Sequence, residues 1–110
     1  MYFHAAENYC KSLGAHLIEF STKAQYEFLI KSRKTAGTAN SKEIWIGLKQ
    51  KQRAWYWIHS KTKLNSFFQN KVQGTGGGEK YQAIYPSGRW EPEGPSSGDQ
   101  NVPVCQKTSF

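Results

Sequence analysis

Two neighbouring stretches decide the fold expected for this chain: Ile44-Trp45-Ile46-Gly47-Leu48 and Ala54-Trp55-Tyr56-Trp57-Ile58. Both are rich in the aromatic and β-branched residues that suit strands, so both are expected in one sheet. Large aromatic side chains dominate small cores, and we therefore expect Trp45, Trp57 and the later Trp90 to be buried. Gly47 is expected to permit close packing or an unusual backbone angle.

On the N-terminal side, the sequence predicts two helices separated by a short extended segment at 16–20. The first helix follows from four residues at helical spacing, Phe3, Ala6, Cys10 and Leu13. Gly14 is placed to end it by entering the left-handed region. The second helix is expected to be capped by Ser21 or Thr22, to end near Lys34, and to direct inward Tyr26, Leu29 and Ile30.

On the C-terminal side, residues 59–79 are polar and end in a glycine run at 74–78 that suits a hinge. Such a long excursion within a compact domain is usually functional or mobile. We expect the loop at 61–78 to be exposed and poorly tied down, since its only apolar anchors are Leu64, Phe67, Phe68 and Val72. Three short strands are predicted after it, at 81–85, 88–90 and 102–105.

The length and composition indicate one folded domain covering residues 1–110. A chain of 110 residues supports a single core, and an aromatic content of 15% argues against disorder. No run approaches 18 apolar residues, so no membrane-spanning segment is expected. No apolar signal segment follows the N-terminus, so a secreted form would be represented here by its mature part or a fragment.

The two cysteines, Cys10 and Cys105, lie near opposite ends of the chain. In a reducing compartment they would be two unrelated thiols, whereas in a secreted domain they would form a staple. Closing a loop of about 100 residues stabilises a fold by roughly 4.7 kcal/mol in the chain-entropy treatment. No CxxC pair, zinc-ligand spacing or N-glycosylation sequon is present.

The formal net charge is +7, and the positive charge is concentrated in one third of the chain. Residues 44–78 contain no Asp or Glu but hold six cations: Lys49, Lys51, Arg53, Lys61, Lys63 and Lys71. Such a surface attracts sulfated polysaccharide, acidic mineral, anionic lipid or acidic protein. The alternative is a solvated basic face that improves solubility and binds nothing.

Several motifs in one order resemble the C-type lectin-like domain family. The phrase Phe3-x-x-Ala6-x-x-x-Cys10-x-x-x-Gly14-Ala15-His16-Leu17 is similar to the first helix of that family. The WIGL strand at 45–48, the W-x-W at 55–57, Gly88-x-Trp90 and the terminal Cys105 follow in the expected order. The resemblance implies an α+β fold with two helices flanking a mainly antiparallel sheet, a long loop, and a disulfide between Cys10 and Cys105.

The chain departs from the family pattern where calcium and sugar are bound. The resemblance implies a Glu-Pro-Asn or Gln-Pro-Asp triplet in the long loop and a later Trp-Asn-Asp triplet. This chain has Gln69-Asn70-Lys71-Val72-Gln73-Gly74 and Trp90-Glu91-Pro92 instead. Calcium requires six to eight oxygen ligands, so no metal or cofactor is expected. The remnant metal candidates are Glu79, Glu91 and Glu93.

Two further departures concern how the fold is tied together. The family's inner disulfide would need cysteines near Gln82 and after Trp90, and both are absent. The long loop is therefore expected to be mobile. The strand that normally precedes the first helix is also missing, which indicates truncation or an open sheet edge.

These observations favour an extracellular recognition module over an enzyme. His4, His16 and His59 match no HExxH motif, and no GxSxG or phosphate loop is present. One hypothesis is a secreted or ectodomain module that binds a protein or glycan without calcium. The alternatives are a polyanion-binding basic face and a calcium-dependent lectin with an unusual site; nucleic acid is a weaker candidate. The candidate ligand-binding residues are Lys61, Lys63, Asn65, Asn70, Lys71 and Glu79.

Overall fold

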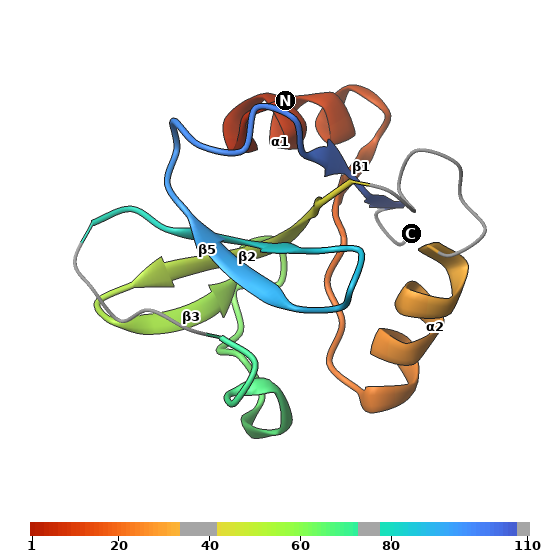
Figure 1. Cartoon of the computed structure of the whole chain (residues 1–110), viewed down its shortest axis with the longest axis vertical. Helices are drawn as coiled ribbons and strands as arrows, with labels where there is room; N and C mark the ends of the chain where they lie inside the picture. Colours follow the sequence, from red (N-terminus) through yellow and green to blue (C-terminus); the bar gives the residue numbers. More distant parts are fainter. Residues whose placement is uncertain (34–41, 73–77, 108–110) are drawn as a thin grey trace.

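The computed structural model describes residues 1–33, 42–72 and 78–107 (Figure 1). Along the chain these residues form α1 (Phe3–Ser12), β1 (Ala15–Leu17), α2 (Lys23–Arg33), β2 (Ile44–Lys51), β3 (Ala54–Trp57), the short 3-10 helix η2 (Ser66–Phe68), β4 (Tyr81–Ile84), β5 (Trp90–Glu93), β6 (Val102–Pro103) and β7 (Cys105–Lys107). The predicted α+β architecture of two helices with a mainly antiparallel sheet is confirmed.

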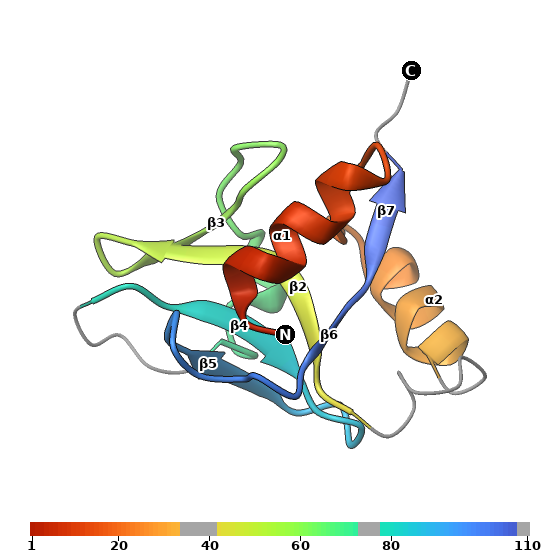
Figure 2. The same ribbon diagram turned by 90° about the horizontal axis from the view of Figure 1, so that it is seen from above.

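The strands form one large sheet and one small ladder. The large sheet has the antiparallel order β3-β2-β4-β5, and β6 pairs in parallel with β2. β1 and β7 form a separate antiparallel pair. Figure 2 shows α1 lying across β2 and α2 lying beside β7. The large sheet therefore buries one face against α1 and the other against an aromatic cluster that includes α2 residues.

The α1 face of the sheet is closed by residues that the helical spacing had identified. Phe3, Ala6 and Cys10 are fully buried and pack with Trp45 and Tyr81. Phe3 stacks on Tyr81 with ring centroids 3.8 Å apart. Apolar residues at every third or fourth position form one stripe of a helix, which explains why this short segment is held against the sheet.

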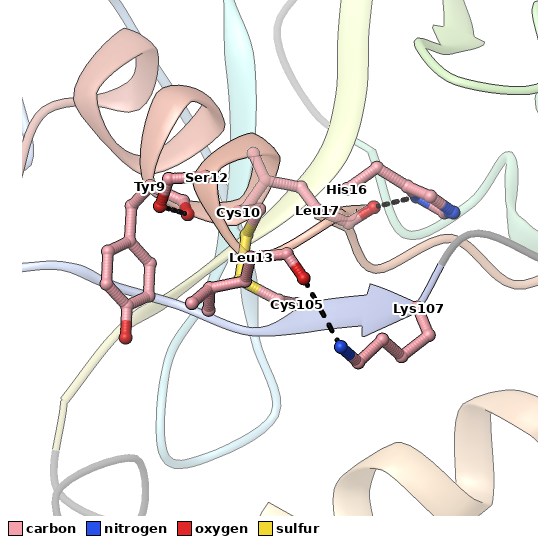
Figure 3. The surroundings of a disulfide bond; sticks show 8 residues. All are labelled: Tyr9, Cys10, Ser12, Leu13, His16, Leu17, Cys105 and Lys107. Carbon is pink, nitrogen blue, oxygen red and sulfur yellow. Dashed lines mark hydrogen bonds between the residues drawn. A yellow bond between two sulfur atoms is a disulfide. The ribbon is translucent and has the colours of Figure 1, made fainter.

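The disulfide between Cys10 and Cys105 is present, with Cα atoms 5.4 Å apart (Figure 3). It joins the last turn of α1 to β7 across a sequence separation of 95 residues. Gly14 follows the helix with φ +69°, in the left-handed region expected of a helix end. The Lys107 ammonium donates to the Leu13 carbonyl at 3.2 Å and adds a second link between the same segments.

The opposite face of the sheet is covered by an aromatic cluster centred on Phe20. Its ring contacts four others, Tyr26, Trp57, Phe68 and Trp90. The indole N–H of Trp90 donates to the Tyr26 hydroxyl at 3.2 Å, so burial of this polar group is compensated. The expected burial of Trp45, Trp57 and Trp90 is confirmed, with exposed fractions of 0%, 3% and 2%.

Helix α2 begins with a reciprocal cap formed by Thr22 and Gln25. The Thr22 hydroxyl accepts the Gln25 backbone N–H at 3.1 Å, and the Gln25 side chain accepts the N–H groups of Ser21 and Thr22. This arrangement identifies Thr22 as the capping residue. Leu29 is buried, while Tyr26 and Ile30 are partly buried against the core, as predicted. The described helix ends at Arg33; Lys34, the predicted end, lies outside the described residues.

Two strand predictions need correction. The predicted strand at 102–105 is divided into β6 and β7, because Val104 leaves the large sheet and its carbonyl accepts the N–H of Ile18 at 2.9 Å. The predicted strand at 88–90 begins only at Trp90. Gly88 lies in the preceding turn at φ +95°, where its N–H donates to the Tyr85 carbonyl.

The prediction of a poorly tied loop at 61–78 is wrong for its first part. Leu64 and Phe68 are buried, and Leu64 N–H donates to the Trp55 carbonyl at 2.8 Å. Only one of the two adjacent phenylalanines enters the core, since Phe67 remains 49% exposed. Residues 73–77, which include most of the predicted glycine hinge, lie outside the described residues.

Candidate functional site

The six predicted ligand-binding residues do not converge on one site. Lys61 and Lys63 lie beside β3, and Glu79 lies before β4. Asn70 is exposed in the turn after η2. Three separate environments are therefore candidates for a site: the carboxylates around β4 and β5, the segment around η2, and the surface of β2 and β3.

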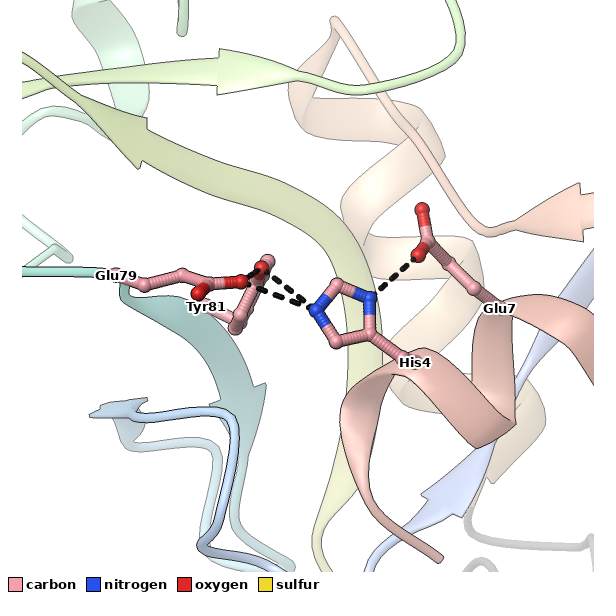
Figure 4. A network of polar contacts seen from close by, with 4 residues as sticks. All are labelled: His4, Glu7, Glu79 and Tyr81. Atoms are coloured by element: carbon pink, nitrogen blue, oxygen red, sulfur yellow. Dashed lines mark hydrogen bonds and ion pairs between the residues drawn. The ribbon is translucent and has the colours of Figure 1, made fainter.

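Glu79 is engaged in a polar network that ties β4 to α1 (Figure 4). His4 Nε2 lies 3.0 Å from the Glu79 carboxylate, and His4 Nδ1 lies 3.1 Å from Glu7. The Tyr81 hydroxyl donates to the same Glu79 oxygen. Both sides of the imidazole are thus occupied by carboxylates, so its protonated form is favoured in the folded state.

The pKa directions in this network follow from these contacts. Hydrogen bonding to Glu79, and next to Glu7, raises the pKa of His4. Hydrogen bonds from Tyr81, and next from His4, lower the pKa of Glu79. Burial, followed by the contact with Glu79, raises the pKa of the Tyr81 hydroxyl. The Glu79 oxygen that faces α1 is consequently committed to protein donors.

Glu91 and Glu93 have different partners from Glu79. Arg89 donates to Glu91 at 3.1 Å, and Asn101 donates to Glu93 at 2.9 Å. Burial, and next a contact with the Glu43 carboxyl, raises the pKa of Glu93 to about 7. We refer to Glu79, Glu91 and Glu93 together as the acidic edge. Within residues 1–33, 42–72 and 78–107, no three His, Cys, Asp or Glu side chains are grouped so as to hold a metal ion.

The residues around η2 use their polar groups within the protein. The Asn65 side chain accepts the Phe67 N–H at 2.7 Å and donates to the Ser21 carbonyl at 2.8 Å. It therefore caps η2 and links it to the start of α2. The Lys71 ammonium lies 5.1 Å from the centre of the Tyr26 ring, in cation–π range.

A cationic groove of about 440 Å³ lies on the surface of the β2–β3 hairpin. Its lining residues are Lys49, Lys51, Gln52, Tyr56, Trp57, Ile58 and Lys61. Strand register brings Lys49 opposite Tyr56, and Tyr56 is bridged in turn to Lys63. We call Lys49, Lys51, Tyr56, Lys61 and Lys63 the basic face.

The ammonium groups of the basic face have no fixed partners. Within the part of the chain that the structure describes, none of its four lysine ammonium groups takes part in a hydrogen bond or salt bridge. Lys71 and Lys107, by contrast, are placed against a ring and a carbonyl. Unpaired lysines on a shared surface leave their positive field available to an external anion.

The backbone around the groove carries unusual conformations. Among the described residues, the non-glycine residues with positive φ are Gln52 (52°), Arg53 (68°) and Lys61 (62°). Gln52 and Lys61 line the groove, and Arg53 lies between β2 and β3. Left-handed conformations of this kind cost about 1 kcal/mol or more and concentrate at ligand sites.

A second pocket of about 390 Å³ adjoins the groove through Ile58 and Lys61. His16 and His59 stack there, with ring centroids 3.8 Å apart. Glu19 also lines it, but its carboxylate accepts the backbone N–H groups of His59 and Ser60. At the base, a Cβ on Gly47 would lie 2.9 Å from the Leu17 carbonyl, which confirms that this glycine permits close packing.

Tyr56 was not among the residues singled out from the sequence. The sequence nevertheless contained the information, because successive side chains of a strand point to opposite faces of the sheet. In Trp55-Tyr56-Trp57 the tyrosine must therefore lie on the face opposite the two tryptophans. Trp55 and Trp57 are buried in the aromatic cluster, whereas Tyr56 is half-buried on the opposite face, beside the lysines.

Comparison with known families and proteins gives one consistent match. Residues 1–107 match the family model of the Lectin C-type domain. The human protein C-type lectin domain family 10 member A is 31% identical over 93% of this chain and 30% of its own length. Rat asialoglycoprotein receptor 2 is 32% identical over 77% of this chain and 29% of its own length. The chain thus spans about 30% of the length of these relatives.

Solved structures show the same fold at lower sequence identity. TC14, a C-type lectin from the tunicate Polyandrocarpa misakiensis, has a TM-score of 0.73 at 13% identity, covering 100% of this chain and 92% of the tunicate protein. The mouse scavenger receptor C-type lectin carbohydrate-recognition domain has a TM-score of 0.64 at 19% identity. The match covers 87% of this chain and 75% of the mouse domain. At these identities the likeness concerns the fold.

Proposed function

The chain belongs to the C-type lectin domain family, and we propose that it is an extracellular module that recognises a protein or glycan ligand without calcium. Membership of this family makes it a recognition domain. The proposal adds the calcium independence, the extracellular location and the absence of catalysis.

One observation carries the calcium independence: the three carboxylates of the acidic edge are held by three different sets of partners. Glu79 is bound by His4 and Tyr81, while Glu91 and Glu93 are bound elsewhere. A calcium ion needs six to eight convergent oxygen ligands with enough negative charge. Recruiting both carboxylate oxygens of Glu79 would require breaking the contacts of its Oε2 with His4 and Tyr81. The six cations in residues 44–78 would also repel a divalent ion.

An extracellular location is supported by the covalent architecture. Disulfides persist in oxidising compartments, and the Cys10–Cys105 bond closes nearly the whole described chain. None of the helices within the described residues has the length and apolar character needed to cross a membrane. We further propose that the module has no catalytic activity, because the carboxylate and imidazole groups described above are engaged in structural contacts.

The proposed ligand surface is the basic face together with the neighbouring pocket. Both surfaces are concave: the groove lies on the paired strands of the β2–β3 hairpin, and the pocket lies between α1, β1 and the segment 58–61. The lysine ammonium groups of the basic face are unpartnered among the described residues, whereas the carboxylates of the acidic edge are bound by protein groups. A rigid surface loses little conformational entropy on binding, which suits it to recognition.

Calorimetry with calcium and an array screen test the proposal together. We expect no saturable heat when millimolar calcium is added to the folded domain, and equal ligand binding on a protein and glycan array in calcium and in chelator. Glu79→Ala and the control Glu27→Ala, an exposed residue on α2, should behave alike in the calcium titration. A one-to-one heat that is abolished only by Glu79→Ala would overturn the proposal, as would array binding that chelator removes.

A further inference from the structure

We propose that a row of alternating tyrosine and lysine side chains on the large sheet binds a polysaccharide that carries sulfate or carboxylate groups, with a sugar ring on Tyr56 between Lys49 and Lys63. This inference rests on the proposed recognition function and assigns to it a ligand chemistry and a position. The accessible part of the row, Lys49, Tyr56 and Lys63, includes no residue of the acidic edge.

The row arises from the register of neighbouring strands. Tyr81 of β4 is opposite Lys49 of β2, Lys49 is opposite Tyr56 of β3, and Tyr56 is bridged to Lys63. Residues directly opposite each other project from the same face of a sheet. Neighbouring strands are about 4.8 Å apart, so Lys49 and Lys63 flank Tyr56 at a mutual backbone separation of roughly 10 Å.

One end of the row is closed and the other is open. Tyr81 is covered by α1, where Phe3 stacks on its ring and its hydroxyl contacts Glu79. Lys49 and Lys63 are exposed, and Tyr56 is half-buried. The accessible part of the row therefore presents an aromatic surface with an ammonium group on each side.

The groove extends this arrangement along the strands. Lys51 is two residues from Lys49 on the same strand face, and Lys61 lines the groove beside Tyr56. The nearby carboxylate of Glu79 is already engaged, because it lies 3.0 Å from His4 Nε2 and accepts from the Tyr81 hydroxyl. An anionic chain in the groove would therefore meet lysines whose ammonium groups form no hydrogen bond or salt bridge within the described residues.

The backbone supplies an observation independent of charge. Gln52, Arg53 and Lys61 adopt positive φ, and two of the three line this groove. A hairpin turn of this shape normally uses asparagine and glycine, which adopt it without strain. Residues held in such strained backbone conformations cluster at active sites and ligand-binding sites.

A polysaccharide fits these features better than an acidic protein or a nucleic acid. A groove of about 440 Å³ admits a narrow chain but not the convex surface of a folded protein. Single-stranded nucleic acid is bound on a series of aromatic platforms, whereas Trp57, the other ring of the groove, is buried. The lining cations are all lysines, which bind as point charges, and not the arginines favoured for phosphate recognition.

The first experiment measures binding of a heparin hexasaccharide by calorimetry, both in chelator and in added calcium, at 50 and 300 mM salt. We expect Lys49→Gln combined with Lys63→Gln to weaken binding about tenfold at low salt. The matched control removes the same charge from α2, through Lys23→Gln combined with Lys31→Gln, and should change affinity less than about twofold. Both control lysines are exposed and lie outside the groove.

The second experiment separates the aromatic contact from charge. Tyr56→Phe should retain hexasaccharide binding, whereas Tyr56→Ala should weaken it about tenfold while the lysines remain. Urea unfolding of both variants confirms that the compared proteins are folded. If Tyr56→Ala does not fold, the triple variant Tyr56→Phe, Lys49→Gln, Lys63→Gln replaces it. It should lose affinity as the Lys49→Gln, Lys63→Gln variant does.

The outcomes distinguish this inference from the proposed function. Equal losses in the Lys49/Lys63 and Lys23/Lys31 pairs would overturn the row, as would equal affinity for polyglutamate or single-stranded DNA of matched charge. Absence of hexasaccharide binding would also overturn the proposed binding row. Array binding in chelator would then still support the proposed calcium independence. Conversely, hexasaccharide binding that depended on Lys49, Lys63 and Tyr56 but also required calcium would contradict the proposed function. It would still support the row as the binding site.

Discussion

The acidic edge and the basic face are both associated with the large sheet, but they differ in whether their charged groups are bound by other groups of the protein. Each carboxylate of the acidic edge is bound by groups of the protein itself, such as His4 with Glu79 and Asn101 with Glu93. The lysines of the basic face have no such partners among the described residues. Charges that are satisfied internally hold a fold together, whereas charges left free attract a ligand.

The two regions also differ in what supports them. The basic face is carried by β2, β3 and the segment that follows β3, and Trp57 and Phe68 anchor this region in the aromatic cluster. The acidic edge depends on polar contacts to α1 and to the 94–101 connection. Perturbing apolar packing should therefore affect the basic face, and changing pH should affect the acidic edge.

The largest effect is expected for Phe68→Ala, which removes a fully buried ring from the aromatic cluster that anchors the segment after β3. We expect unfolding in urea to show a loss of about 3–5 kcal/mol, because a large cavity is left in the core. Phe67→Ala is the matched control: its ring is 49% exposed, so a loss below about 1 kcal/mol is expected. Similar losses in the two variants would show that η2 is not the anchor of this region.

A smaller effect is expected at the acidic edge, where the pKa of Glu93 is raised from 4.5 to about 7. The folded state binds this proton more tightly than the unfolded state, so the contribution is full below about pH 4.5 and is lost as pH rises to about 7. Glu93→Gln should flatten this fall and be more stable than the parent at pH 7.5. Denaturation from pH 4.5 to 7.5 tests this, and a pH profile identical to that of Glu27→Gln would contradict it.

At the hairpin of the basic face, relieving backbone strain should stabilise the protein slightly. Gln52→Asn combined with Arg53→Gly places at φ 52° and 68° the residues that tolerate such angles. We expect a gain of about 1 kcal/mol or less in thermal unfolding. Gln52→Ala keeps the strain and should give no gain; a stability increase in this control as well would show that strain is not the cause.

The smallest effect concerns the exposed network around His4, where global stability should barely change. Contact with Glu79, and next with Glu7, raises the pKa of His4 above 6.5. Its contribution is full below pH 6.5 and is lost as pH rises through the raised pKa. Titration of the imidazole by NMR should show this pKa falling towards 6.5 in Glu79→Gln. An unchanged His4 pKa, matching that of Glu27→Gln, would exclude the contact in solution.

Much of the fold followed from local patterns. The helical spacing of Phe3, Ala6 and Cys10 and the aromatic strands at 44–48 and 54–58 were found as predicted, since each depends on a few neighbouring residues. The boundary errors occurred where a long-range contact intervened. Val104 has a strand-like sequence around it but leaves the large sheet, because its carbonyl accepts the backbone N–H of Ile18, 86 positions earlier.

The candidate site was predicted in composition but not in arrangement. The sequence identified Lys61, Lys63 and Glu79 and the cationic segment 44–78. It did not separate these residues into a basic face and an acidic edge. Neither Tyr56 nor His4 was selected, because their roles depend on partners from other strands and helices.

The sequence by itself therefore determined the family, the secondary structure of the motifs and the excess of positive charge. These properties depend on residue type and spacing along the chain, which local propensity and hydrophobic period express directly. Only the tertiary structure decided which charges are paired. Strand register places Tyr56 between Lys49 and Lys63, and helix packing brings His4 to Glu79, 75 positions away. Such pairings depend on strand register and on the packing of the whole core, so they cannot be inferred from any single segment of the sequence.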